Sequence, residues 1–255
     1  MRIPRIVIAG ATSGVGKTSI TCSIIHSLQK HGFSVQPFKV GPDYIDPGYL
    51  SSISKHETYN LDVWLMGKNK LLNSFISNSQ SDVSVIEGVM GYYDGFGGDS
   101  NHASTHHVAS LTKSPVLLVL DASKTSRSIA ATALGFVKFH KNSRISGIIL
   151  NKIGSKKHEI LCRTALEKIK IPIIGAIPKN LLLNMPSRHL GLISTLESKT
   201  LKTQIQKVSK IISNHLDINE IIKIIKNSSD LTKKPKPLIK KVKTTIAVAL
   251  DTSFN

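Results

Sequence analysis

The sequence predicts a three-layer, doubly wound α/β domain with a mostly parallel sheet. Apolar runs alternate with amphipathic stretches from the N-terminus onward, and the apolar runs are continuous, as in strands that are buried on both faces. A glycine-rich turn, GATSGVGK, joins the first apolar run to the first amphipathic stretch. Strands and helices that alternate in this way form a parallel sheet with helices on both faces.

The strands can be placed in order from their apolar and β-branched residues. The first reads RIVIA and the fourth reads PVLLVLDA, and such residues favour a pleated, buried surface. The expected strands are 5–9, 34–40, 83–88, 115–122, 144–152 and 171–178. Amphipathic spacing predicts helices at 17–31, 103–112, 126–140, 155–169 and about 196–227.

The predicted domain spans residues 1–227. Residues 228–243 are polar, basic and interrupted by two prolines, which is typical of a linker. The last stretch, 244–255, contains the apolar run TTIAVAL, and a lone strand cannot bury itself. We therefore expect 244–255 to be the first strand of a second, truncated domain. The alternative is that 245–250 adds to the sheet of the first domain.

The composition excludes several classes of protein. Of 255 residues, 40% are hydrophobic and 20% are charged, as in an ordinary globular protein. No apolar run approaches the ~18 residues that cross a bilayer, and the short N-terminal run leads directly into the glycine-rich turn, so we expect a cytoplasmic protein that contacts no membrane. Cys22 and Cys162 lack the spacing of a zinc site or a disulfide framework.

The net charge of +18 reflects 34 lysines and arginines against 16 acidic residues. Such a surface attracts polyanions. Aromatic residues make up only 5% of the chain, and no RNA-binding or helix-turn-helix pattern is present, so nucleic acid is not expected as a partner.

The glycine-rich turn has the features of a phosphate-binding loop. Glycines permit backbone angles that let amide groups surround phosphate oxygens at a helix N-terminus. The lysine at its end can reach the terminal phosphates, and the following threonine can ligate Mg²⁺. The expected ATP-binding residues here are Gly14, Val15, Gly16, Lys17, Thr18 and Ser19.

A nucleotide site of this kind needs a further carboxylate for its metal. Glu87 ends the strand at 83–88, beside the crevice in which open α/β sheets bind ligands. The glycine-rich continuation GVMGYYDGFGGD describes an active-site loop that carries Asp94 and Asp99. Asn151 ends another strand, where it can read a base edge or act as a turn residue.

The stretch KVGPDYIDPGYL places two carboxylates, Asp43 and Asp46, just after the strand at 34–40. Both GPD and IDP favour turns, so turn formation is the alternative to a catalytic role. The two roles are compatible, because a rigid turn is how two carboxylates would be held beside a phosphate loop.

Three histidines and one arginine are further candidate site residues. His102, His106 and His107 lack the HExxH glutamate and other zinc-ligand spacing, so surface or loop histidines are expected. Arg188 follows the last predicted strand, where it can clamp a carboxylate or phosphate or anchor the C-terminal extension.

An ordered series of motifs resembles the cobyrinic acid a,c-diamide synthases, amidotransferases of cobalamin biosynthesis. The motifs are GATSGVGKT, FKVGPDYIDPGY, NLDVWLM, VIEGVMGYYDG, PVLLVLDAS, GIILNK, GAIP and PSRHLGL. They extend over essentially the whole chain, and GPDYIDP and EGVMGYYDG are the most specific. The N-terminal domain of that family is similar to dethiobiotin synthetase, a P-loop NTPase whose loop places its first glycine one position early. The resemblance accounts for Gly10 followed by Ala11.

The resemblance implies ATP- and Mg²⁺-dependent amidation of the c and then the a side-chain carboxylate of a tetrapyrrole-derived polycarboxylate. ATP would phosphorylate the carboxylate, and ammonia from glutamine would displace the phosphate. Thr18, Asp46 and Glu87 would hold the metal. The catalytic residues implied are Lys39, Asp43, Asp46 and Asp94, and the substrate-binding residues are Tyr44, Asp94 and Arg188.

The resemblance also sets the expected partners and the alternatives. The family's C-terminal domain, a class I glutaminase in cis, is expected to be absent here because the chain stops at Asn255; a homodimer is compatible with the family. One alternative is the same chemistry on nickel-sirohydrochlorin or hydrogenobyrinic acid. Another is a MinD/ParA-like regulatory ATPase, but those proteins have a lysine where this chain has Ala11 and Thr12, and they lack GPDYIDP.

Overall fold

The computed structural model describes residues 2–179 and 199–231, together with residues 245 and 247. Its strands are β1 (Arg5–Gly10), β2 (Val35–Val40), β3 (Tyr59–Leu61), β4 (Val83–Glu87), β5 (Val116–Asp121), β6 (Ile145–Ile153) and β7 (Ile173–Pro178). Its helices are α1 (Lys17–Lys30), α2 (Asp46–Ser54), α3 (Val63–Asn78), α4 (Thr105–Leu111), α5 (Ser128–Lys138), α6 (Lys156–Leu166), the 3₁₀ helix η1 (Glu167–Ile169), α7 (Lys199–Ser213) and α8 (Ile218–Lys226). Within these ranges no helix has the length and apolar character needed to span a membrane.

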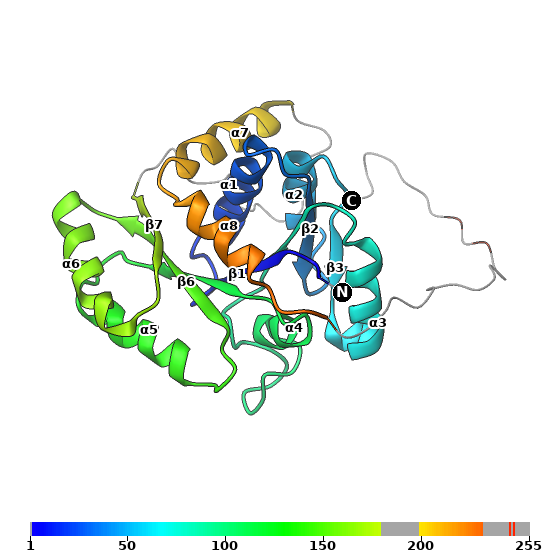
Figure 1. The fold of residues 1–255 in the computed structure, drawn as a ribbon, viewed down its shortest axis with the longest axis horizontal. Coiled ribbons are helices and arrows are strands. Elements are labelled where there is room, and N and C mark those ends of the chain that lie inside the picture. Colours follow the sequence, from blue (N-terminus) through cyan, green and yellow to red (C-terminus); the bar gives the residue numbers. More distant parts are fainter. Residues whose placement is uncertain (1, 180–198, 232–244, 246, 248–255) are drawn as a thin grey trace.

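The strands form one sheet in the order β3-β2-β4-β1-β5-β6-β7. Every pair of neighbouring strands is parallel. β1 lies at the centre, between β4 and β5, so the direction of winding reverses beside it (Figure 1). Ligands of open α/β sheets bind at such a reversal, beyond the carboxyl ends of the strands. The predicted doubly wound sheet is confirmed.

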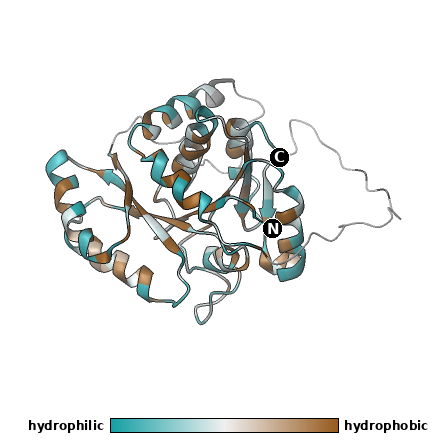
Figure 2. Ribbon diagram, in the orientation of Figure 1, coloured by the Kyte–Doolittle hydropathy of each residue, from teal (hydrophilic) through white to brown (hydrophobic). Residues whose placement is uncertain are grey.

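Helices cover both faces of the sheet. α1, α2, α7 and α8 lie on one face and α3, α4, α5 and α6 on the other (Figure 1). Successive residues of β1 contribute to separate cores: Ile6 and Ile8 pack with the first group of helices, and Val7 and Ala9 with the second. Figure 2 shows the apolar stripes of the helices against the sheet. Burial on both faces explains why the strands are continuous apolar runs.

The described part of the C-terminal segment is tied to β1 by Arg5. The buried Arg5 guanidinium donates hydrogen bonds to the carbonyl oxygens of Thr112 and Ser229, each at 2.6 Å. The Ser228 hydroxyl donates to the Arg5 carbonyl at 2.9 Å, and Leu231 is buried in the core. The first four residues of the predicted linker 228–243 therefore pack on the domain. The other linker residues, like the predicted strand 244–255 apart from residues 245 and 247, lie outside the described residues.

The sequence-based prediction does not include β3 or α3, and it differs from the structure at two further places. The stretch expected to be a turn between the two aspartates leads into a helix, α2, that begins at Asp46 with Pro47 in its first turn, a position where proline's fixed φ suits a helix. The helical stretch expected at 196–227 is two helices, because Asp217 accepts a hydrogen bond from the Glu220 amide and begins α8.

Candidate active site

The phosphate loop connects β1 to α1 at the centre of the carboxyl edge. Gly14 and Gly16 have φ angles of +73° and +92°, which only glycine adopts readily. Gly10 must also lack a side chain, because a Cβ there would lie 2.6 Å from a methyl group of Val15 and 2.9 Å from the Thr12 carbonyl oxygen. The early position of the first glycine therefore follows from packing inside the loop.

The loop ends in two residues that face the carboxyl edge. Lys17 is 8% exposed, and its ammonium donates to the carbonyl oxygens of Met90 at 2.6 Å and Thr12 at 3.2 Å. The Thr18 hydroxyl donates to Glu87 Oε1 at 2.7 Å. Val15 and Ser19 are buried. Lys17 and Thr18 thus contact the end of β4 and the loop that follows it.

A buried ion cluster lies next to the phosphate loop. Lys39, at the end of β2, is 2% exposed, and its ammonium lies 2.7 Å from Asp46 Oδ2, 3.0 Å from Glu87 Oε1 and 3.8 Å from Asp43 Oδ2. It also donates to the Gly88 carbonyl oxygen at 3.2 Å. β2 and β4 are neighbours in register, with Lys39 opposite Glu87, so the sheet itself brings the two charges together.

The charges of the cluster shift one another's pKa values. Burial alone would lower the pKa of Lys39, but the charges of Glu87 and Asp46 outweigh it and raise that pKa. Burial raises the pKa of Glu87 and the Asp46 charge adds to the increase, while Lys39 opposes it. Glu87 Oε2 has no hydrogen-bond partner among the described residues. The cluster therefore has more carboxylate groups than ammonium groups, and one carboxylate oxygen, Glu87 Oε2, accepts no hydrogen bond from a described residue.

Asp43 supports the cluster through the backbone. Its Oδ1 accepts hydrogen bonds from the amides of Ile45 at 2.9 Å and Asp46 at 3.1 Å, so the turn role proposed from the sequence is present. Asn60, in β3, donates to the carbonyl oxygens of Gly41 at 2.8 Å and Asp43 at 2.6 Å. Asn60 is a positioning residue that we did not predict, and its only sequence signal was its place in NLDVWLM.

The loop between β4 and α4 packs against the phosphate loop. The Tyr92 amide donates to the Gly10 carbonyl oxygen at 2.8 Å. Asp94 is exposed, and its Oδ2 accepts from the Gly91 amide at 2.9 Å. The Thr105 hydroxyl binds both the amide and the carbonyl of Val89, at 2.9 and 3.0 Å. The loop is therefore held in place at both ends, with Asp94 at its open side.

Asn151 fastens the phosphate loop to β6. Its Nδ2 donates to the Val15 carbonyl oxygen at 2.8 Å, and its Oδ1 accepts from the Lys152 amide at 2.9 Å. A Cβ on Gly16 would lie 2.5 Å from this Nδ2. The Asn151 side chain therefore braces the phosphate loop and is not only a turn former. Reading of a base edge by Asn151 stays a prediction.

The remaining predicted residues have different outcomes. Tyr44 is 64% exposed and lies between Asp43 and Asp46 at the carboxyl edge. Asp99 is exposed in the loop after β4. Arg188 lies outside the described residues. The structure thus brings together Lys17, Thr18, Lys39, Asp46 and Glu87, with Asp43 at their margin.

The histidines form a packed cluster. His106 is buried, against the expectation of a surface position, because α4 directs it toward Tyr92 and His140, with ring centroids 5.4 and 4.4 Å away. Its Nε2 lies 3.2 Å from the Asn142 carbonyl oxygen. In the described part of the chain no three His, Cys, Asp or Glu side chains are placed to hold a metal. The pKa of His106 is lowered to about 4, first by burial and then by the charge of His140.

Because His106 is buried, we expect the stability of the protein to fall in acid. His106 stays neutral in the folded state while its unfolded form, with an ordinary pKa of 6.5, takes up a proton. The free energy of unfolding should therefore fall by up to about 3 kcal/mol as pH drops from about 7 to 4. His106→Gln should flatten this part of the profile, measured by urea unfolding, whereas His215→Gln, at an exposed position, should keep it. The same pH dependence of unfolding in all three proteins would show that His106 is not its cause.

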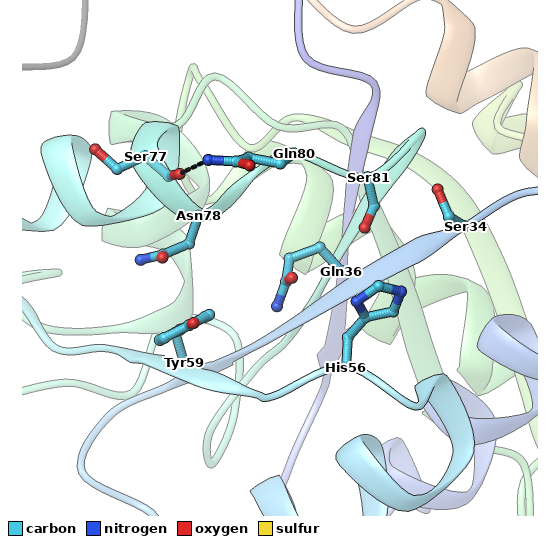
Figure 3. A pocket seen from close by; sticks show the side chains of 8 residues that line it. All are labelled: Ser34, Gln36, His56, Tyr59, Ser77, Asn78, Gln80 and Ser81. Carbon is cyan, nitrogen blue, oxygen red and sulfur yellow. Dashed lines mark hydrogen bonds between the residues drawn. The ribbon is translucent and has the colours of Figure 1, made fainter.

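A separate cavity of about 430 Å³ lies at the opposite edge of the sheet (Figure 3). It lies near the amino ends of β2, β3 and β4 and the end of α3. Its lining residues are Ser34, Gln36, His56, Tyr59, Ser77, Asn78, Gln80 and Ser81. Among the described residues, no lysine, arginine or carboxylate lines it, so these residues offer no ammonium, guanidinium or carboxylate group for phosphates or a metal. Binding of phosphates and a metal is better supported at the carboxyl edge of the sheet.

That edge combines two elements of phosphoryl-transfer chemistry. The phosphate loop at the N-terminus of α1 can surround phosphate oxygens with amide groups. Thr18, Glu87 and Asp46 offer hydroxyl and carboxylate oxygens, and Mg²⁺ in nucleotide sites commonly takes one or two carboxylates beside phosphate oxygens and water. The unpartnered Glu87 Oε2 fits such a cation. The donor set is therefore compatible with a magnesium nucleotide.

Known proteins resemble this chain in sequence. Residues 6–193 match the family model described as the CobQ/CobB/MinD/ParA nucleotide binding domain. The chain is 42% identical to a cobyrinate a,c-diamide synthase of Listeria innocua, over 89% of this chain and 51% of the relative. It is also 42% identical to the enzyme of that name from Picrophilus torridus, over 100% and 58%. The chain thus spans about half the length of these curated relatives.

A solved structure shares the fold. The structure of chloroplast FtsY from Physcomitrella patens aligns with a TM-score of 0.50 and 16% sequence identity, over 69% of this chain and 59% of that chain. At this identity the similarity concerns the arrangement of the strands and helices alone.

Proposed function

The chain belongs to the CobQ/CobB/MinD/ParA nucleotide binding domain family, and from this premise we propose that it is the ATP-dependent amidating half of a cobyrinate a,c-diamide synthase. The observation that carries the proposal is the buried Lys39–Asp46–Glu87 cluster beside the phosphate loop. Curated relatives at about 40% identity over nearly the whole chain carry that enzyme name. The glutamine-hydrolysing half is assigned to sequence outside this chain, because these relatives are almost twice as long.

The proposed reaction has two steps. An oxygen of the substrate's c or a carboxylate attacks the γ-phosphorus of ATP, the bond to the β-phosphate oxygen breaks, and ADP leaves. Ammonia then attacks the acyl carbon, inorganic phosphate leaves, and a proton is lost from nitrogen to give the amide. Phosphoryl transfer depends mainly on positioning and on charge neutralisation.

The residues of the cluster divide these tasks. The loop amides and Lys17 bind the β- and γ-phosphates, and Lys39 offsets negative charge between the γ-phosphate and the substrate carboxylate. Thr18, Glu87 and Asp46 would hold Mg²⁺, which when bound supplies further positive charge to the phosphate oxygens. We assign to Asp94, which is exposed in the loop after β4, the role of accepting the proton from the attacking ammonia. Tyr44 and Arg188 remain proposed substrate contacts.

Other functions within the family are less well supported. MinD/ParA-like regulatory ATPases lack a GPDYIDP segment, whereas in this chain that segment supplies Asp46, whose Oδ2 lies 2.7 Å from the Lys39 ammonium. Amidation of nickel-sirohydrochlorin or hydrogenobyrinic acid would use the same residues. The relatives are named cobyrinate a,c-diamide synthases, which favours cobyrinate among these rings.

The proposal is tested by supplying ammonia directly. With Mg-ATP, cobyrinic acid and a high ammonium concentration, the chain should form ADP and amidated corrinoid, detected by mass spectrometry as replacement of one or two hydroxyl groups by amino groups. Lys17→Ala should abolish both products, because its ammonium contacts the terminal phosphates. ATP hydrolysis that is independent of cobyrinic acid, without any amide, would instead favour a regulatory ATPase.

A further inference from the structure

Two aromatic side chains form an exposed stack on the carboxyl edge of the sheet. The rings of Trp64 and Phe96 lie 4.2 Å apart at an interplanar angle of 25°, and the ring of His102 meets Trp64 edge-on at 6.0 Å. Trp64 is 57% exposed and Phe96 is 59% exposed. We refer to Trp64, Phe96 and His102 as the aromatic rim. Large apolar side chains gathered in one exposed place commonly mark a binding surface.

The backbone around Trp64 holds it outward. Asp62 Oδ1 accepts a hydrogen bond from the Leu65 amide at 3.0 Å and caps the first turn of α3. Gly67, with φ 70° and ψ 160°, then breaks the helix. Val63 on the inner side of this turn is buried, while Trp64 faces solvent. The helix cap at Asp62 and the kink at Gly67 therefore place Trp64 at the surface.

Phe96 is held in a similar way. Its amide donates to the His102 carbonyl oxygen at 2.8 Å, which closes the loop between β4 and α4 on itself. A Cβ on Gly95 would lie only 2.1 Å from that oxygen, so the residue before Phe96 must be glycine. Both members of the stack are thus fixed by backbone contacts, and a preformed surface loses little conformational entropy when a ligand binds.

The aromatic rim adjoins the Lys39 cluster. In the sheet, Leu61 of β3 lies opposite Val40 of β2, the residue after Lys39. Trp64 follows Leu61 by three residues, which extend at most about 10 Å, and neighbouring strands lie about 5 Å apart. Phe96 is two residues beyond Asp94 in the loop whose Gly88 carbonyl accepts from Lys39. A ligand with one group at Lys39 can therefore reach the rim if it is a macrocycle.

The surroundings of the rim are basic. Lys68, in the next turn of α3, is exposed. The rings of His102 and His107 lie 5.4 Å apart. Burial, followed by the charges of Lys68 and His102, lowers the pKa of His107. With a net charge of +18 on the whole chain, a polycarboxylate is attracted to this edge. The rim thus offers apolar ring faces beside the Lys68 ammonium.

We propose that the aromatic rim binds the apolar ring of a macrocyclic polycarboxylate substrate and so presents one edge carboxylate to Lys39. This inference rests on the proposed function and adds the surface that holds the ring. The ring packs on the exposed side of the Trp64–Phe96 stack, and its other carboxylates face Lys68, His102 and His107. The phosphate loop and the Lys39 cluster act on one carboxylate at a time.

Replacement of Trp64 provides the first test. With ammonium and saturating Mg-ATP, Trp64→Ala should raise KM for cobyrinic acid about tenfold or more, equivalent to about 1.4 kcal/mol. The KM for ATP and kcat should change by less than about threefold. Trp64→Phe should restore most of the affinity, because it keeps a ring. Ile160→Ala, a change at a 56% exposed side chain of α6, is the matched control and should leave all three values unchanged.

A second test reads contact without turnover. Trp64 is the single tryptophan of the chain, so its fluorescence lifetime reports this surface alone. Cobyrinic acid should reduce the rate constant for quenching by acrylamide, whereas Mg-ATP alone should leave it unchanged. Unaltered quenching, together with an unaltered KM in Trp64→Ala, would overturn the rim as the ring-binding surface.

The outcomes separate the two proposals. Amidation that is insensitive to Trp64→Ala overturns the rim and leaves the proposed function intact. Protection of Trp64 by cobyrinic acid without any amidation supports the rim and overturns the proposed reaction. A lower kcat with unchanged cobyrinic acid binding also overturns the rim, and it would point to a partner domain on this surface instead. Absence of both binding and amidation overturns both.

Discussion

Glu87→Gln is expected to lower amidation at least about 100-fold while the protein keeps its stability. Removal of one preorganised electrostatic contact in an active site costs about 3–4 kcal/mol in the transition state. Glu87 is proposed to hold the magnesium ion that neutralises the phosphate oxygens, and it also accepts hydrogen bonds from Thr18 and Lys39. The substitution preserves shape, and the glutamine oxygen can still accept both of those hydrogen bonds. The free energy of unfolding should therefore change by no more than about 1 kcal/mol.

The pH dependence provides a second signature of Glu87. Its folded-state pKa is raised above the ordinary value of 4.5, chiefly by burial, so the folded protein binds the proton more tightly than the unfolded chain does. This contribution to stability is present at low pH and is lost as pH rises through the folded-state pKa. Glu87→Gln should gain stability relative to the original protein as pH rises above 4.5, measured by urea unfolding. Full amidation activity in this variant would contradict the proposed role of Glu87 in the reaction.

Lys39→Met is expected to destabilise the fold itself. It leaves Asp46 and Glu87 buried, close together and without their cation, and removal of one partner from a buried ion pair costs about 3–5 kcal/mol. The loss should be largest at neutral pH and should shrink as pH falls, because a protonated carboxyl can bind a neighbouring carboxylate. Amidation should be lost at every pH, since the charge beside the γ-phosphate is gone.

Two variants test whether this loss comes from burial. Lys152→Met removes a cation 2.6 Å from Asp121, but that pair is about one-third exposed, so a cost of no more than about 1 kcal/mol is expected. The double variant Lys39→Met/Glu87→Gln removes one of the two stranded charges and should recover part of the stability, without activity. Equal costs for Lys39→Met and Lys152→Met would mean that the cluster is hydrated rather than buried.

Most of the strands could be predicted because burial on both faces requires a continuous apolar run. The segments predicted at 83–88 and 115–122 are strands at Val83–Glu87 and Val116–Asp121. β3 was missed because three residues at the edge of a sheet carry too little pattern. The helices α2 and α3 were also missed. In α2, Asp46 followed by Pro47 suits a turn as well as a first helical turn.

The candidate site was predictable in its types of residue but not in their partners. The phosphate loop, Glu87 and the two aspartates are recognisable in the chain. The roles of Asn60 and Asn151 as braces were not, because their carbonyl partners are distant in sequence: Asn151 donates to the carbonyl of Val15, which is 136 residues away. His106 was expected at the surface, but its neighbours Tyr92 and His140 come from other elements.

By itself the sequence determined the doubly wound fold, the phosphate loop and the types of charged group at the site, because apolar period, glycine backbone freedom and motif order are local properties. The tertiary structure decided which charges meet. Lys39 lies beside Glu87 only because β2 and β4 pair in parallel, in register, across 48 residues. The stack of Trp64 on Phe96 likewise depends on a helix cap and a loop that meet in space. Contacts between distant segments follow from strand order and packing, which no local pattern encodes.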